Sequence, residues 1–207
     1  MTVEELRGDG RFECWLVLRH DELLPFVQEE FSRRSFILRF YILLNILLLL
    51  LMLVLGAWQA HQGLITAGAI IRYSTLGLAL ALTVLVPVHE AIHGLAYKLV
   101  GAPRVQFGAD IRKFIFYALA DHFVVGRPAF RLVALAPFAA ISFCVLCCIF
   151  FVPLTYQWLL LGVLLMHTGA CAGDFAMLSF FRRYRDKEIY TYDDVPNRVS
   201  YFFRRKE

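Results

Sequence analysis

Long apolar stretches separated by short polar segments dominate the chain. Four of them are near or above the roughly 20 residues that cross the hydrocarbon core of a bilayer. They run over about residues 36–56, 73–100, 130–152 and 156–180. The pattern predicts an all-α membrane protein with four transmembrane helices.

Between the second and third stretches the pattern changes to period two. Val105 to Arg112 alternates apolar and polar positions, and Phe114 to Ala118 adds an aromatic-rich run. Alternation with β-branched and aromatic residues is typical of a strand. We therefore expect a short β-hairpin at the membrane surface, in the region 101–129 between helices two and three.

The remaining segments are polar. Residues 1–35 carry no cleavage site of small residues behind a short apolar core, which argues against a signal peptide. We expect them to form a small cytoplasmic N-terminal cap and residues 182–207 to form a basic and aromatic tail. The four-helix transmembrane domain then spans residues 36–181.

Composition and charge support a multi-pass protein of the cell membrane. Hydrophobic residues make up 59% of the 207 residues, and the mean hydropathy is +0.62. Lysine and arginine number six before Tyr41, one between the first two spans, six from Lys98 to Arg131, none between the last two spans and eight after Phe181. By the positive-inside rule, both termini are expected in the cytoplasm. Anionic lipid headgroups explain the net charge of +4 better than nucleic acid does.

The sequence His89-Glu90-Ala-Ile-His93 lies near the end of the second apolar stretch. Histidines four apart on a helix share a face and can bind one zinc ion. Glu90 is then placed to act as general base on the attacking water. Ionisable groups at membrane depth are costly and usually line a site, so a chance match is the weaker interpretation.

A hydrolytic zinc site needs a third protein ligand. The fourth stretch contains His167 and Asp174, two helical turns apart in an apolar segment. Asp174 is the preferred third ligand, because an intramembrane carboxylate needs a partner. His167 could support a metal ligand through a hydrogen bond, stabilise the transition state, or be the third ligand in place of Asp174. Gly169 and Gly173 would let this helix approach span two closely.

These residues carry a resemblance. His89-Glu-Ala-Ile-His93-Gly, Leu135-Ala-Pro137 and Gly173-Asp174 resemble the site-2 protease class of intramembrane zinc peptidases. More closely, the layout is similar to a bacterial and archaeal family of short four-span zincin membrane peptidases. The resemblance implies zinc and a transmembrane or membrane-proximal protein substrate. Site-2 proteases carry Asn-Pro-Asp-Gly around the third ligand, where this chain has Ala172-Gly-Asp174-Phe.

The sequence thus predicts a membrane-embedded zinc metallopeptidase with Glu90 as catalytic base and His89, His93 and Asp174 as metal ligands. The alternative is a non-enzymatic membrane protein with a structural or transported metal. A closed site that includes His167 or Cys171 would favour that alternative.

Overall fold

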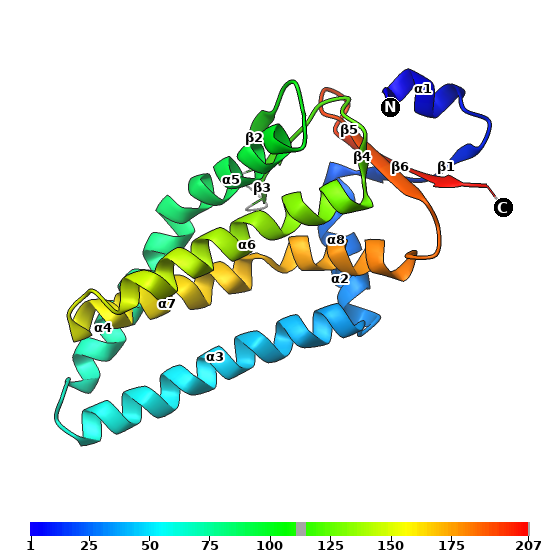
Figure 1. Ribbon diagram of the computed structural model, residues 1–207. Helices are drawn as coiled ribbons and strands as arrows, with labels where there is room; N and C mark the ends of the chain where they lie inside the picture. The colour runs from blue at the N-terminus through cyan, green and yellow to red at the C-terminus, as the bar shows by residue number, and fades with distance from the viewer. Residues whose placement is uncertain (111–114, 207) are drawn as a thin grey trace.

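The computed structural model describes residues 1–110 and 115–206, so the turn of the predicted hairpin lies outside the described residues. The chain is mostly helical, with a four-stranded sheet and a two-stranded hairpin (Figure 1). The helical elements are α1 (Val3–Gly8), η1 (His20–Glu22), α2 (Leu23–Ser32), α3 (Phe36–His61), α4 (Ala67–Leu80), η2 (Ala81–Leu85), α5 (Val86–Leu99), α6 (Arg127–Ile149), α7 (Leu154–Ala170) and α8 (Ala172–Arg183). The strands are β1 (Phe12–Arg19), β2 (Gln106–Asp110), β3 (Ile115–Leu119), β4 (Val125–Gly126), β5 (Ile189–Asp194) and β6 (Val199–Arg205).

Three helices among the described residues are long and apolar enough to cross a membrane. They are α3, the continuous helix of 33 residues from Ala67 to Leu99, and α6. The pair α7 and α8, bent by 41° at Cys171, makes a fourth if it forms one span. The prediction of several apolar spans in a mostly helical chain is confirmed. The second span begins at Ala67, so Arg72 lies within the helix and not in the loop before it.

Glycines bring α4 and α7 into direct backbone contact. A Cβ added at Gly77 would lie 2.0 Å from the carbonyl oxygen of Leu159, and one at Gly162 would lie 2.2 Å from that of Ser74. A Cβ at Gly169 or Gly173 would meet nothing within 4 Å. The expectation that Gly169 and Gly173 permit the close approach is therefore wrong, because the helices cross two turns earlier in α7.

The sheet is the main departure from the predicted all-α fold. It has the order β1-β6-β5-β4, so the N-terminal segment and the C-terminal tail pair as neighbouring antiparallel strands. Leu18, Ile189 and Phe202 pack against Phe180 and Phe181 of α8. On the other side, Tyr192 and Phe203 pack against α1. These aromatic residues of the tail are thus core residues of a sheet.

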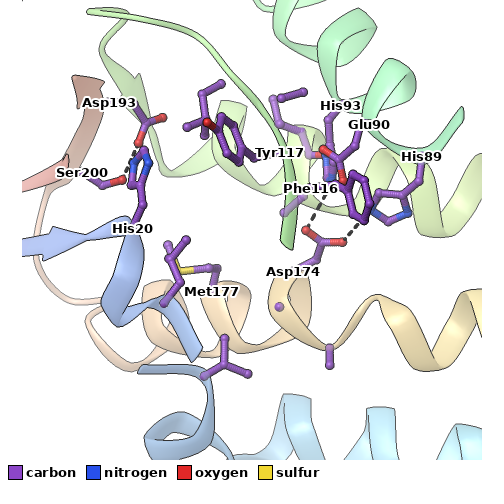
Figure 2. A pocket seen from close by; sticks show the side chains of 18 of the residues that line it. His20, His89, Glu90, His93, Phe116, Tyr117, Asp174, Met177, Asp193 and Ser200 are labelled. Carbon is purple, nitrogen blue, oxygen red and sulfur yellow. Dashed lines mark hydrogen bonds and ion pairs between the residues drawn. The ribbon is translucent and has the colours of Figure 1, made fainter. Parts of the chain in front are cut away.

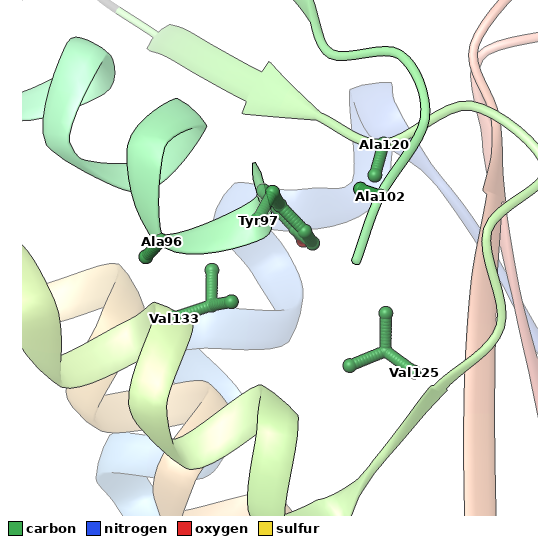
Figure 3. Close-up of a cluster of buried hydrophobic side chains, with 6 residues drawn as sticks. All are labelled: Ala96, Tyr97, Ala102, Ala120, Val125 and Val133. Carbon is green, nitrogen blue, oxygen red and sulfur yellow. The ribbon is translucent and has the colours of Figure 1, made fainter. Parts of the chain in front are cut away.

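The predicted hairpin is present as β2 and β3, which pair in antiparallel register with Gly108 opposite Tyr117. It lies beside α5 (Figure 1). Below it, a cluster of buried side chains joins α5 to the start of α6 (Figure 3). The cluster comprises Ala96, Tyr97, Ala102, Ala120, Val125 and Val133. It fixes the motif helix against the helix whose backbone supports His93.

Candidate metal centre

The motif helix α5 begins where the helical hydrogen-bond pattern changes. Pro87 lies in its first turn and cannot donate a backbone hydrogen bond. The preceding segment η2 is π-helical, a local widening that is frequent at functional sites. From this start, His89 and His93 extend from one face of α5, with ring centroids 4.7 Å apart.

Asp174 faces both histidines from α8. Its Oδ2 lies 3.4 Å from Nε2 of His89, and its Oδ1 lies 3.3 Å from Nε2 of His93 (Figure 2). The break at Cys171 makes Asp174 part of the first turn of a new helix. A carboxylate is favoured there, because the helix dipole presents partial positive charge.

The three side chains fit a zinc ion. Their ligand atoms all lie within 4.8 Å of one another. Two ligands of a tetrahedral zinc at bond lengths of about 2.0–2.1 Å are roughly 3.3 Å apart, close to both measured separations. Nδ1 of His93 lies 3.0 Å from the carbonyl oxygen of Val133 and must donate to it. This bond leaves Nε2 of His93 with a free lone pair directed at the site, as in metal-bound histidines.

Glu90 lies beside the metal-ligand candidates. It lines the same cavity as His89, His93 and Asp174, and Ala118 of β3 lines this cavity too. Figure 2 shows Glu90 and Phe116 of β3 next to the histidines. A carboxylate is therefore present next to the candidate zinc site and next to a strand of the hairpin.

His167 lies beside His89, near the end of α7. Its ring is buried and its centroid is 5.5 Å from that of His89. Ligand atoms of His89, His167 and Cys171 form a second group within 4.8 Å. α7 ends at Ala170 and α8 begins at Ala172, so His167 and Asp174 lie on two helices and not on one. His167 lines the cavity beside His89, whereas Asp174 lies close to both motif histidines.

The loop residue His122 joins a separate group. Its Nδ1 is 2.9 Å from Oδ1 of Asp121, and Asp194 completes a set of possible ligands. Cys144 and Cys147 are exposed on α6. Neither the loop histidine nor this cysteine pair lines the cavity that contains the motif.

The cavity at the site has a volume of about 640 Å³ and continues beyond the metal-ligand candidates to the four-stranded sheet. His20, Asp193 and Ser200 line that far end (Figure 2). Burial raises the pKa of Asp193 to about 6, although the Ser200 hydroxyl opposes the rise. Burial also lowers the pKa of His20, with the Arg198 charge adding to the effect. These residues form no motif in the sequence, because the pairing of β1, β6 and β5 brings them together.

Comparison with known proteins gives one family. No curated protein and no solved structure matches the chain. A family model described as "Putative zincin peptidase" matches residues 82–189. This segment is more than half of the 207 residues and contains His89, Glu90, His93, His167 and Asp174. The chain belongs to this zincin peptidase family.

Proposed function

We propose that the protein is a membrane-embedded zinc metallopeptidase that hydrolyses peptide bonds within or next to the bilayer. The observation that carries the proposal is the Asp174 carboxylate within 3.4 Å of both motif histidines, at the wall of a cavity that Glu90 also lines. Membership of the zincin peptidase family and the apolar helices around the site support it.

The residues of the site would have separate roles in metal binding and proton transfer. His89, His93 and Asp174 would hold the zinc, which when bound would polarise the scissile carbonyl and acidify water. Glu90 would take a proton from the attacking water and later give it to the leaving amine. The hydrogen bond from His93 to Val133 would keep the His93 ring in its binding orientation.

The hairpin offers a place for the substrate backbone. In its sheet β3 pairs with β2 alone among the described strands, and Phe116, Tyr117 and Ala118 line the cavity. A transmembrane helix must unwind before its peptide bonds can be cut, and an added strand at β3 would satisfy the freed backbone groups. A membrane or membrane-proximal protein is thus the proposed substrate. We further propose that the chain lies in the cell membrane with both termini in the cytoplasm.

The test is Glu90→Gln, assayed for zinc content and for cleavage of a co-expressed membrane substrate. The amide should leave the zinc in place and lower the cleavage rate by about 10²–10⁴-fold, because it cannot take the proton. Glu29→Gln, on the exposed face of α2, is the matched control and should change neither. Zinc loss or unchanged cleavage in Glu90→Gln would contradict the proposal and favour a metal with a structural or transport role.

A further inference from the structure

The far end of the cavity is built from three separate elements. Asp193 comes from β5, Ser200 from β6 and His20 from η1, and all three line the same cavity as the metal-ligand candidates. The Ser200 hydroxyl donates a 2.5 Å hydrogen bond to Oδ1 of Asp193. All three residues lie outside the segment that the family model matches, residues 82–189.

Asp193 is a largely buried carboxylate without a cationic partner among the described residues. Its one side-chain hydrogen bond there comes from the neutral Ser200 hydroxyl. The charge that acts on its pKa is that of Asp121, which is of like sign and raises it. An ionised carboxylate taken out of water is costly unless a cation pairs with it. The site therefore favours a positively charged ligand.

His20 adds a second unpaired group. Its Nε2 is buried and has no hydrogen-bond partner within residues 1–110 and 115–206. Burial lowers the pKa of the ring and so favours its neutral form, in which one ring nitrogen can accept a hydrogen bond. A ligand with several N–H donors, an ammonium or a guanidinium group, would satisfy both the carboxylate and the imidazole.

The cavity between the two ends is suited to a long side chain. Phe116, Tyr117 and Met177 line it between the metal-ligand candidates and Asp193 (Figure 2). Lysine and arginine bury their methylene stems against apolar surfaces while the charged head finds a polar partner. Arg19 and Arg198 also line the cavity, but Arg19 is paired with Asp21 at 3.1 Å.

We propose that this end of the cavity is a specificity subsite for a lysine or arginine side chain of the peptide substrate. Asp193 is its counter-ion, and Ser200 and His20 are its hydrogen-bonding neighbours. The assignment rests on the proposed peptidase function for the identity of the ligand as a peptide. It makes the enzyme selective for chains with a basic residue a short distance from the scissile bond.

Calorimetric binding to the zinc-loaded full chain in detergent micelles tests the subsite without any turnover. The probes are Nα-acetyl-lysine methylamide and its uncharged counterpart Nα-acetyl-norleucine methylamide, at pH 7.5. The lysine probe should bind at least about tenfold more tightly, since a desolvated charge pair readily exceeds the 1.4 kcal/mol that this ratio represents. Asp193→Asn should abolish the preference, while Asp186→Asn, at a side chain 87% exposed, should keep it.

Results that would contradict the subsite differ from those that would contradict the peptidase function. Equal binding of the two probes by the parent protein, or no binding of either, would overturn the subsite without reliance on any variant. A preference retained in Asp193→Asn would also overturn it, as would tighter binding of Nα-acetyl-glutamate methylamide, which would assign this end to Arg19 and Arg198. Failure of the Glu90→Gln test with the lysine preference intact would contradict the peptidase function and leave the cationic subsite standing.

Discussion

Replacing Gly162 by alanine should destabilise the protein through the contact between α4 and α7. The new Cβ would lie 2.2 Å from the carbonyl oxygen of Ser74, where ordinary contact begins at 3.4 Å. The helices must therefore separate by about 1.2 Å, the difference of these values. Backbone cannot rotate away as a side chain can, so the cost is at the upper end of the 1–3 kcal/mol typical of overpacking. Alanine has a better helix propensity than glycine, which offsets about 1 kcal/mol of this cost.

We expect a net loss of about 1–2 kcal/mol for Gly162→Ala, measured by thermal unfolding in detergent micelles. Gly169→Ala is the matched control in the same helix, where the added Cβ meets nothing within 4 Å. It should be neutral or stabilising by up to about 1 kcal/mol. If Gly162→Ala is as stable as the parent, or if the two variants are equally destabilised, the described contact between α4 and α7 is incorrect.

Asp193→Asn should flatten the pH dependence of stability. The pKa of Asp193, raised from 3.8 to about 6, favours the folded state below about pH 4, and this contribution is lost as the pH rises through about 6. One pKa unit corresponds to about 1.4 kcal/mol, so raising the pH from 4 to 7 should lower the stability of the parent by at most about 3 kcal/mol more than that of the variant. The measurement is the free energy of chemical unfolding at both pH values, and an equal change in the two proteins would refute the prediction. His93→Ala should lose stoichiometric zinc by metal analysis while still inserting in the membrane, because it removes one of three ligand candidates; an unchanged zinc content would exclude His93 as a ligand. With Cys14 as the sole cysteine, an impermeant maleimide should label the exposed thiol from the cytoplasmic side, and labelling from outside would reverse the proposed orientation.

Local sequence patterns predicted most of the long apolar helices. Apolar runs located α3, α6 and most of the helix from Ala67 to Leu99, because each span is defined by its own residues. The motif spacing put His89 and His93 on one face for the same reason. Asp174 could be proposed because an acidic residue in an apolar stretch is conspicuous wherever the helix breaks.

The sheet and the far end of the cavity could not be predicted from local sequence patterns. β1 carries a short alternation, but nothing in it indicates that Leu16 pairs with Phe202. Asp193 and Ser200 look like ordinary polar residues of a charged tail until the register of β5 and β6 sets them opposite each other. The break at Cys171 also lacked a proline, so His167 and Asp174 appeared to share a helix.

The pairing of β1 with β6 also makes one wall of the cavity depend on segments far apart in the chain. The motif helix and both helices of the bent pair lie between these two strands in the sequence, so the metal-ligand candidates all come from the stretch that separates them. The strand β1 leads directly into His20, and β6 carries Ser200. A change that separates the two strands would therefore open the wall at His20 and Ser200 before it reaches the metal-ligand candidates.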